Sequence, residues 1–436
     1  MEKLLRLTRL VIPKRLFRAL QPLYHGLLAT IGAIRFNFPS RKLYVLGITG
    51  TKGKSTVSEL VTAILEEAGH TVALSNTIRI KIADESRPNL YKMSMPGRFF
   101  IQKFLAQAVK EDCGFAVLEM TSEGAKMNRH KHIEMNALIF TNLSPEHIES
   151  HGSFEAYRDA KLLLKDALLT SSKPNRILVA NTDDDHGALF LETGGSEVTT
   201  LPYSLKKAEP YVTNERGTLL TFEGTSIHSP LPGTFNIYNI LAAATFTRSL
   251  GIKREVIKRA VEKLSIVKGR VERIEEGQKF DVIVDYAHTA DSLEKLYNSF
   301  PDSRKICVLG NCGGGRDAGK RPVMAKIAEK YCSEIILTNE DPYDEDPRKI
   351  IEEMQCGLEK KKATVILDRR LAIRHALARA GEHDMVFITG KGTDPYIMEA
   401  KGKKTEWSDE RVTREELYRL LNKSEEHNAG SDSNVK

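Results

Sequence analysis

The sequence predicts an α/β protein in which a central, doubly wound domain is followed by a second, Rossmann-like α/β domain. Short apolar segments, each as long as a buried strand, alternate with helical stretches in two series. The first series comprises residues 43–48, 116–118, 137–140 and 176–179, and the second comprises residues 281–284, 306–310, 335–337 and 385–388. A composition break near residues 267–270 separates them, and 436 residues are ample for two such domains.

These patterns divide the chain into four predicted segments. They are a basic amphipathic segment at 1–40, a central domain at 41–267, a C-terminal domain at 268–415 and a tail at 416–436. Two helices are expected within the central domain, at about residues 55–67 and 236–250. The tail is rich in Ser, Asn, Gly and charged residues and is predicted to be disordered.

The charge balance is mildly basic, with 65 Lys and Arg against 58 Asp and Glu and a net charge of +7. This balance suits an anionic substrate and gives no indication of a nucleic-acid partner. The five cysteines form no C-x-x-C pair, so we expect neither a disulfide framework nor a structural zinc site, and a reducing cytoplasm is the default location. They are Cys113, Cys307, Cys312, Cys332 and Cys356.

The N-terminal segment combines apolar residues at helical spacing with basic residues. Leu4, Leu7, Leu10 and Val11 predict an amphipathic helix, which Pro13 is expected to break or kink. No run of 18 apolar residues occurs, so no transmembrane helix is predicted, and no signal-peptide cleavage pattern follows. Two interpretations stay open: a helix packed on the protein body, or an interfacial helix lying peripherally on the anionic inner face of a membrane.

A glycine-rich turn after the first apolar segment indicates a phosphate-binding P-loop. It leaves a strand and enters a helix, and its glycines let backbone N–H groups point at a phosphate beside the positive end of the helix. Lys54 can reach the β- and γ-phosphates of ATP, and the Ser55 hydroxyl can bind Mg²⁺. The nucleotide-binding candidates are Gly50, Thr51, Lys52, Gly53, Lys54, Ser55 and Thr56.

This loop resembles that of the Mur ligases and of folylpolyglutamate synthetase, which join an amino acid to a carboxylate through an acyl phosphate made with ATP. Within the Mur ligase family, the resemblance is closest to the branch that makes UDP-N-acetylmuramoyl-tripeptide for peptidoglycan. It implies that the chain is an ATP-dependent amide ligase and a cytoplasmic enzyme. The implied partners are a UDP-linked or lipid-linked muramyl peptide and a free amino acid, and a monomer is expected.

The resemblance extends to a metal-binding region. The stretch from Thr141 to Gly152 and the following Tyr157 to Lys161 are similar to the family's T-N-L-x-x-D-H-x-x-x-H-G and Y-x-x-A-K. It implies that Glu119 and His147 bind a second Mg²⁺ and that Lys161 carries a carbamate made with CO₂. Hard Mg²⁺ prefers oxygen ligands, and its charge would screen the two anions that must meet when an acyl phosphate forms.

Further motifs of the family supply the remaining site candidates. Asn236 and Asn239 lie in a segment similar to L-x-G-x-F-N-x-x-N-x-x-A-A, and Asp285 and His288 lie in one similar to D-Y-A-H-T-P. These four residues are implied to close over the nucleotide, although Asp285 and His288 could equally be a hydrogen-bonded loop pair. The implied substrate-binding residues are Ser94, Pro96, Thr121, Arg129, Arg316, Asp341, Gly390 and Asp394.

Several positions depart from the family pattern. The region before Gly47 is shorter than the family's UDP-binding domain, and Tyr343 stands where an Arg is expected to read the distal carboxylate of diaminopimelate. Asp341, Asp344 and Asp394 would instead favour an amino acid with a distal ammonium group. Two other functions stay open: a folylpolyglutamate synthetase-like ligase, and a nucleotide-binding scaffold of a cell-wall complex.

Overall fold

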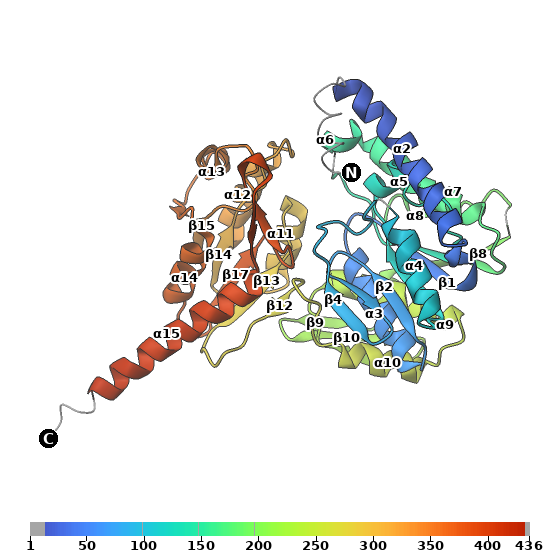
Figure 1. The fold of residues 1–436 in the computed structure, drawn as a ribbon. Helices are drawn as coiled ribbons and strands as arrows, with labels where there is room; N and C mark the ends of the chain where they lie inside the picture. Colours follow the sequence, from blue (N-terminus) through green and yellow to red (C-terminus); the bar gives the residue numbers. More distant parts are fainter. Residues whose placement is uncertain (1–13, 98, 147, 196, 432–436) are drawn as a thin grey trace. The chain divides into compact units, whose positions relative to one another are not determined.

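The computed structural model describes residues 14–97, 99–146, 148–195 and 197–431, with side chains from residue 20 to residue 422 (Figure 1). The chain divides into two compact units, and each is described by itself. Unit 1 comprises Met1–Pro210, Leu220–Ile227 and Ile237–Val261, and unit 2 comprises Tyr211–Leu219, His228–Asn236 and Glu262–Lys436. The helix predicted from Leu4 to Val11 lies outside the described residues.

The helices of the described residues have the following bounds. They are α2 Lys14–Arg35, α3 Lys54–Glu67, α4 Phe100–Lys110, α5 Ser122–Lys126, α6 Ile148–His151, α7 Phe154–Leu169, α8 Gly187–Leu191, α9 Thr234–Ser249, α10 Arg254–Lys263, α11 Ala290–Asn298, α12 Lys320–Tyr331, α13 Pro347–Gln355, α14 Arg369–Arg379 and α15 Asp409–Ser431. Three short 3₁₀ helices lie at η1 Pro39–Lys42, η2 Leu205–Ala208 and η3 Ala400–Gly402.

Unit 1 contains an eight-stranded sheet with the strand order β4-β3-β2-β5-β1-β6-β7-β8. Its strands are β1 Tyr44–Thr49, β2 Val72–Ser75, β3 Arg79–Ile82, β4 Glu85–Pro88, β5 Phe115–Glu119, β6 Ala137–Phe140, β7 Arg176–Asn181 and β8 Val198–Tyr203. In the part of the sheet that runs β2-β5-β1-β6-β7-β8, all neighbouring strands are parallel. β3 pairs antiparallel with β2, and β4 pairs antiparallel with β3. The four predicted strands of the first series are confirmed as β1, β5, β6 and β7.

The centre of this sheet positions the P-loop. β1 pairs with β5 on one side and β6 on the other, with Ile48 opposite Glu119 and Thr49 opposite Phe140. Because parallel strands end at one edge, the residues that follow β1, β5 and β6 meet there, as at the ligand-binding edge of other open α/β sheets. Buried strand residues such as Val45, Leu118 and Leu138 fix the sheet in the core.

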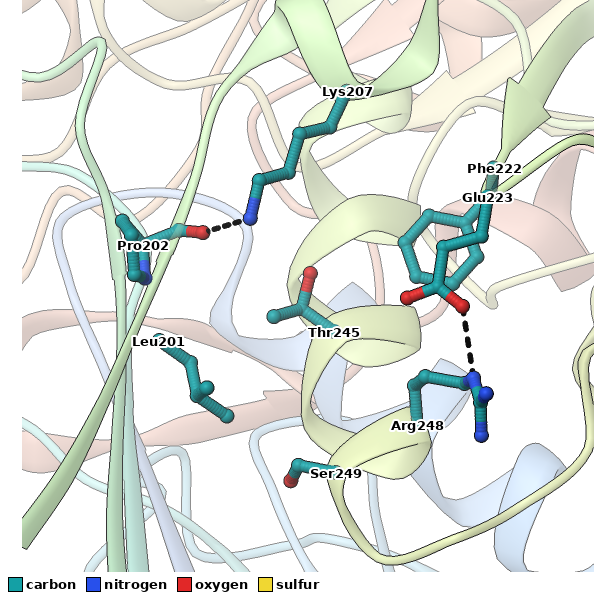
Figure 2. A pocket seen from close by; sticks show the side chains of 8 residues that line it. All are labelled: Leu201, Pro202, Lys207, Phe222, Glu223, Thr245, Arg248 and Ser249. Carbon is teal, nitrogen blue, oxygen red and sulfur yellow. Dashed lines mark hydrogen bonds and ion pairs between the residues drawn. The ribbon is translucent and has the colours of Figure 1, made fainter.

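Away from this edge, unit 1 contains an open cavity of about 640 Å³ (Figure 2). Leu201 and Phe222 line it together with an ion pair between Arg248 and Glu223, whose Nε and Oε2 lie 2.8 Å apart. None of the site residues predicted from the sequence lines this cavity. We therefore place the candidate site at the sheet edge.

Unit 2 contains a six-stranded sheet with the order β12-β13-β17-β14-β15-β16, in which only β12 is antiparallel. Its strands are β12 Glu272–Arg273, β13 Asp281–Asp285, β14 Lys305–Leu309, β15 Glu334–Leu337, β16 Thr364–Val365 and β17 Met385–Thr389. The second predicted series is confirmed as β13, β14, β15 and β17. Two small antiparallel sheets comprise β9 Val212–Asn214, β10 Gly217–Phe222 and β11 Thr225–Ser229, and β18 Tyr396–Met398 with β19 Lys404–Glu406.

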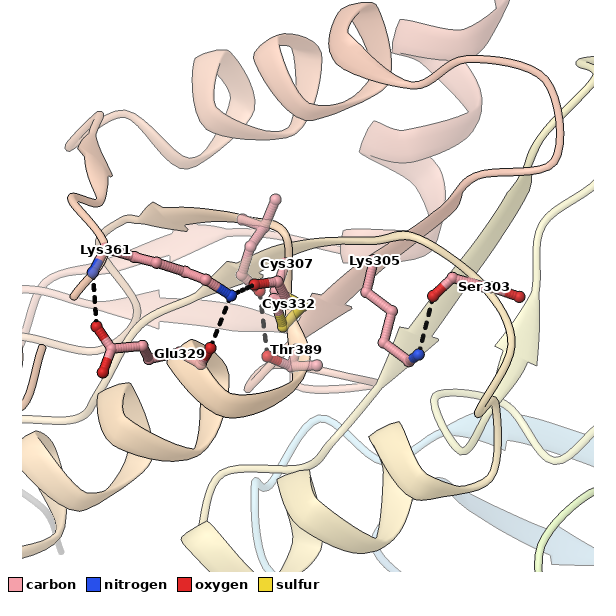
Figure 3. The surroundings of a disulfide bond; sticks show 8 residues. Ser303, Lys305, Cys307, Glu329, Cys332, Lys361 and Thr389 are labelled. Atoms are coloured by element: carbon pink, nitrogen blue, oxygen red, sulfur yellow. Dashed lines mark hydrogen bonds between the residues drawn. A yellow bond between two sulfur atoms is a disulfide. The ribbon is translucent and has the colours of Figure 1, made fainter. Parts of the chain in front are cut away.

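Unit 2 also contains a disulfide bond, so the expectation that the cysteines stay unpaired is wrong for two of them (Figure 3). Cys307 lies in the middle of β14 and Cys332 directly follows α12, and their Cα atoms are 6.1 Å apart. They meet because α12 returns the chain to β15, the neighbour of β14. Both side chains are buried, and Cys113, Cys312 and Cys356 are free thiols.

The C-terminal tail differs from its prediction as well, because α15 continues to Ser431 through residues expected to be disordered. Charged pairs at helical spacing support the helix, including Glu410 with Arg414 at 2.6 Å. Glu416 is buried and bonds to Arg370 and Arg374 of α14, which attaches α15 to the sheet. Composition alone missed these contacts between helices.

Candidate functional site

The P-loop depends on two glycines with positive φ angles. Gly50 has a φ of 145° and Gly53 one of 84°. A Cβ at Gly50 would lie 1.9 Å from Oγ1 of Thr141, and one at Gly53 would lie 2.3 Å from Oδ1 of Asn239. No larger residue therefore fits at either position. Gly53 caps α3 without a side-chain hydrogen bond, which leaves the first turn of the helix suited to an anion.

Two lysine side chains lie against this loop. Lys54 at the start of α3 donates from Nζ to the carbonyl oxygens of Gly50 and Thr51, at 3.0 and 2.8 Å. Lys161 of α7 donates from Nζ to the same oxygen of Gly50, at 2.6 Å. Lys161 is 2% exposed, and burial, together with the charge of Lys54, lowers its pKa well below the ordinary lysine value. The fold therefore disfavours the protonated form of this amine.

A carboxylate and a hydroxyl form a second feature of the loop. Ser55 Oγ donates to Oε2 of Glu119 at 2.8 Å, and Glu119 also accepts hydrogen bonds from Thr77 and Ser94. Burial alone would raise the pKa of Glu119, but the charge of Lys54 and these hydrogen bonds hold it below its usual value. Glu119 is thus an anion, and its oxygens with Ser55 Oγ are the hard donors that Mg²⁺ prefers.

Further contacts fasten the loop to the segment after β6. Lys52 Nζ donates to Glu146 Oε1 at 2.9 Å, and its backbone N–H donates to Asn142. The hydroxyls of Thr51 and Tyr157 lie 2.9 Å apart. His147, predicted to bind metal, lies outside the described residues. Among those that are described, no three His, Cys, Asp or Glu side chains form a metal-binding cluster.

The residues predicted to bind the acceptor peptide fall into two groups in unit 1. Ser94 donates to Glu119 at 2.8 Å and so belongs to the metal-site candidates. Arg129 donates to the carbonyl oxygen of Met95 at 2.8 Å, and Pro96 and Arg129 line one small hollow beside α2. Thr121 caps α5 by accepting from Gly124 N–H. Burial lowers the pKa of Arg129, and its Nε has no partner.

In unit 2, Asp285 is the last residue of β13, and His288 lies in the loop that follows. Asp285 accepts from the N–H groups of Val271 and Ala287 at 2.7 and 2.6 Å, and burial raises its pKa. His288 Nδ1 lies 2.7 Å from the carbonyl oxygen of Tyr286. These bonds to the backbone shape the loop. Asn236 likewise donates to the carbonyl oxygen of Pro232.

The other predicted residues of unit 2 surround a buried lysine. Lys391 donates from Nζ to Asp341 at 2.8 Å and lies 3.4 Å from Asp394. It also donates to the carbonyl oxygen of Tyr396 at 2.6 Å. The carboxylates of Asp341 and Asp394 are therefore already paired with a cation. Lys391 was not predicted from the sequence, although its neighbours Gly390 and Asp394 were.

Glu340 is a second residue that sequence reasoning missed. It is 2% exposed, and its Oε1 accepts from the thiol of Cys312 at 3.0 Å. Its Oε2 has no hydrogen-bond partner among the described residues. A Cβ at Gly390 would lie 2.4 Å from this Oε2, so Glu340 lies against one of the predicted substrate-binding positions. Cys312 is thus a hydrogen-bond donor, and burial and the nearby Glu340 raise its pKa.

The glycine-rich loop before α12 carries Arg316, which is exposed. The loop is held to the segment after β15, because Gly313 N–H donates to the carbonyl oxygen of Asp341 at 2.8 Å. A Cβ at Gly314 would lie 2.7 Å from the ring of Tyr343. Arg316, Tyr343, Glu340 and Gly390 thus belong to neighbouring loops at the same edge of the second sheet.

Comparisons with known proteins match both units. Residues 48–247 match the Mur ligase middle domain, and residues 269–392 match the Mur ligase, glutamate ligase domain. UDP-N-acetylmuramoyl-L-alanyl-D-glutamate–2,6-diaminopimelate ligase of Bacillus cereus is 34% identical over 95% of this chain and 84% of its own. The corresponding enzyme of Bacillus velezensis is 37% identical over 82% of this chain and 75% of its own.

Solved structures agree with these matches. A structure of UDP-N-acetylmuramoyl-L-alanyl-D-glutamate–2,6-diaminopimelate ligase has a TM-score of 0.60 at 28% identity, covering 87% of this chain and 79% of that one. Folylpolyglutamate synthase of Mycobacterium tuberculosis has a TM-score of 0.67 at 14% identity, covering 84% of this chain and 92% of that one, which shows a shared fold. With both domains matched and relatives aligned over most of their length, the chain belongs to the Mur ligase family of ATP-dependent amide ligases.

Proposed function

We propose that the chain adds an amino acid to the terminal carboxylate of a UDP-linked muramyl peptide in the cytoplasm. The observation that carries the proposal is the arrangement of Lys54, Lys161 and the Ser55–Glu119 pair around the carbonyl of Gly50. A binding module would need the loop to hold ATP, but it would not need a buried neutral amine and a buried carboxylate beside it. The lipid-linked peptide is the second candidate acceptor.

The reaction divides into two steps. A carboxylate oxygen of the acceptor attacks the γ-phosphorus of ATP, the bond to the β-phosphate oxygen breaks, and ADP leaves an acyl phosphate. The amino group of the incoming amino acid then attacks the acyl carbon, loses a proton and expels phosphate, which forms the amide. Lys54 supplies a point charge for the transferring phosphoryl group, and the N-terminus of α3 binds its oxygens.

Mg²⁺ would be held by Ser55, Glu119 and His147, and it would screen the charges of the phosphates and the acceptor carboxylate. Lys161 is proposed to carry a carbamate. Its lowered pKa supports this, because only a neutral amine can attack CO₂. Carbamylation changes a potential cation into an anion that can take part in the metal shell.

The remaining predicted residues receive binding roles. Thr51, Lys52 and Thr56 with Asn236, Asn239, Asp285 and His288 would contact the nucleotide, and Asn239 already lies against Gly53. Ser94, Pro96, Thr121 and Arg129 would contact the acceptor peptide. Arg129 has a buried Nε without a partner, which suits an anionic group. Arg316 would bind the carboxylate of the amino acid through two parallel hydrogen bonds.

The amino acid is proposed to have a distal ammonium group and no distal carboxylate. Tyr343 cannot form an ion pair with a carboxylate, whereas Glu340 has a buried oxygen without a partner. Asp341 and Asp394 share Lys391, so Glu340 replaces them as the residue that selects the ammonium. A side chain at Gly390 would clash with this oxygen, because a Cβ there would lie 2.4 Å from it. Lysine and ornithine have this chemistry, and the relatives named above act on diaminopimelate.

The test is ADP release by the purified protein with UDP-linked muramyl dipeptide and one amino acid at a time. Lysine or ornithine should support release, and diaminopimelate should support little. Release with a pterin polyglutamate acceptor and glutamate would favour the folylpolyglutamate synthetase-like alternative. ATP binding without ADP release for any acceptor, UDP-linked or lipid-linked, would favour the scaffold. A Lys54→Ala variant identifies release by contaminating enzymes.

A further inference from the structure

Helix α2 exposes a row of large aliphatic side chains. Leu20, Leu23, Leu27, Ile31 and Ile34 are 44%, 70%, 60%, 45% and 64% exposed. They are separated by three or four residues and therefore lie on one side of the helix, along about 21 Å of its length. We refer to these five residues as the exposed face of α2. Such a contiguous apolar surface differs from the scattered exposed leucines of ordinary surfaces.

The opposite side of α2 packs on its own unit. Ala29 and Ala33 are buried, and a Cβ at Gly32 would lie 2.9 Å from the ring of Phe99. Asn128 Nδ2 donates to the carbonyl oxygen of Pro22 at 3.1 Å, and Thr30 Oγ1 lies 2.9 Å from Nε2 of His132. The helix is therefore held by one side, and the burial of that side does not explain the apolar residues on the other.

The charges of α2 indicate what covers the exposed face. The sequence of the helix contains Lys14, Arg15, Arg18 and Arg35 and no Asp or Glu. A second copy of the chain packed through the same face would bring two wholly basic helices together, and like charges oppose that contact. An anionic lipid surface accepts both the aliphatic side chains and the cations. None of the described helices has the length and hydropathy needed to cross a bilayer.

We propose that the exposed face of α2 binds the surface of a bilayer containing anionic phospholipids. The helix lies in the plane of the interface, the aliphatic side chains enter the boundary between head groups and acyl chains, and the basic residues remain among the phosphates. This inference does not rest on the proposed ligase activity, since it concerns a surface that contains none of the P-loop residues.

The test is sedimentation of the full-length protein with vesicles, without nucleotide or substrate. Vesicles of phosphatidylglycerol mixed with phosphatidylcholine should sediment the protein, and vesicles of phosphatidylcholine alone should bind it at least tenfold more weakly. The Leu23→Glu/Leu27→Glu variant should lose at least tenfold in binding. The matched control is Leu371→Glu/Tyr418→Glu, which adds the same charge at exposed positions on α14 and α15 of unit 2 and should bind like the parent.

Three results would overturn the proposal: no sedimentation of the parent, equal binding to both kinds of vesicle, or unchanged binding of the α2 variant. Sedimentation velocity without lipid tests the alternative that a second copy of the chain binds the exposed face of α2. An oligomer of the parent that Leu23→Glu/Leu27→Glu dissociates, without vesicle binding, would assign the face to a second copy. Thermal unfolding by circular dichroism shows whether the variant folds, and Leu23→Ser/Leu27→Ser, which adds no charge, replaces it if it does not.

Discussion

Nζ of Lys161 lies 2.6 Å from the carbonyl oxygen of Gly50, although 111 residues separate them in the sequence. The contact joins the middle of α7 to the first glycine of the P-loop. The buried amine also lies over the ring of Tyr157, with Nζ 4.7 Å from the ring centroid. A residue that is part of the loop's support is therefore also the candidate for chemical modification.

We expect Lys161→Ala to lose nearly all ADP release while its fold is kept. The reason is that the carbamate proposed to complete the metal shell cannot form. Short carboxylates added to the assay should restore part of the activity, because they can enter the space left by the side chain. Parent activity should fall reversibly in CO₂-depleted buffer, whereas that of Lys161→Ala should not change. Parental activity in the variant would show that Lys161 has no catalytic role.

Lys161→Met should change the pH dependence of stability. The pKa of Lys161 is lowered in the folded protein, so between that pKa and the ordinary lysine value the unfolded chain binds the additional proton. The free energy of unfolding of the parent should thus rise with pH, by up to about 1.4 kcal/mol per pH unit from this group. Urea unfolding in CO₂-depleted buffer at neutral and alkaline pH should show a smaller rise for the variant. Equal slopes would mean that the buried amine is charged.

Lys54→Ala should abolish ATP turnover and leave the fold intact. It removes the charge from the transferring phosphoryl group, and losses of this kind commonly cost on the order of 100-fold or more in rate. The measurement is ADP release under saturating substrates, with Lys110→Ala as a control at an exposed lysine of α4. Turnover within about tenfold of the parent would contradict the assignment.

The fold and the P-loop could be predicted because both depend on local sequence. Apolar runs such as 137–140 and 385–388 mark central parallel strands, which are buried on both faces. The short strands β2 to β4 and β9 to β11 carry weaker patterns and were not predicted. The contact of Gly53 with Asn239 depends on tertiary structure and was not predicted, although the family resemblance implied that Asn239 binds the nucleotide.

Features that depend on tertiary contacts could not be predicted from the local sequence. The pairing of Cys307 with Cys332 depends on where α12 returns the chain, and the unpartnered oxygen of Glu340 depends on which donors the fold brings near it. Asp341 and Asp394 were predicted to attract an ammonium group, but the sequence did not indicate that Lys391 already lies between them. The role of every site residue stays a prediction until it is tested by substitution.

Arg316→Lys should raise the KM for the amino acid by at least tenfold with a smaller effect on the KM for ATP. A lysine keeps the positive charge but cannot form the two parallel hydrogen bonds of a guanidinium with a carboxylate. Arg348→Lys provides the control, because Arg348 is an exposed residue of α13 outside the glycine-rich loop. If the KM for the amino acid does not change, Arg316 is not part of its site.

Glu340→Gln tests the choice of amino acid. Glutamine keeps the shape of the side chain and can still accept from Cys312, but it removes the negative charge that would bind a distal ammonium group. We expect kcat/KM with lysine or ornithine to fall by 10-fold to 100-fold, the range of about 1.5–3 kcal/mol that hydrogen bonds to charged groups contribute. The value for an amino acid with a neutral side chain, such as norleucine, should change little or rise. Glu353→Gln, at a half-exposed carboxylate of α13 bonded to Arg321, is the matched control. An equal loss for lysine and norleucine would mean that Glu340 supports the loop without reading the substrate.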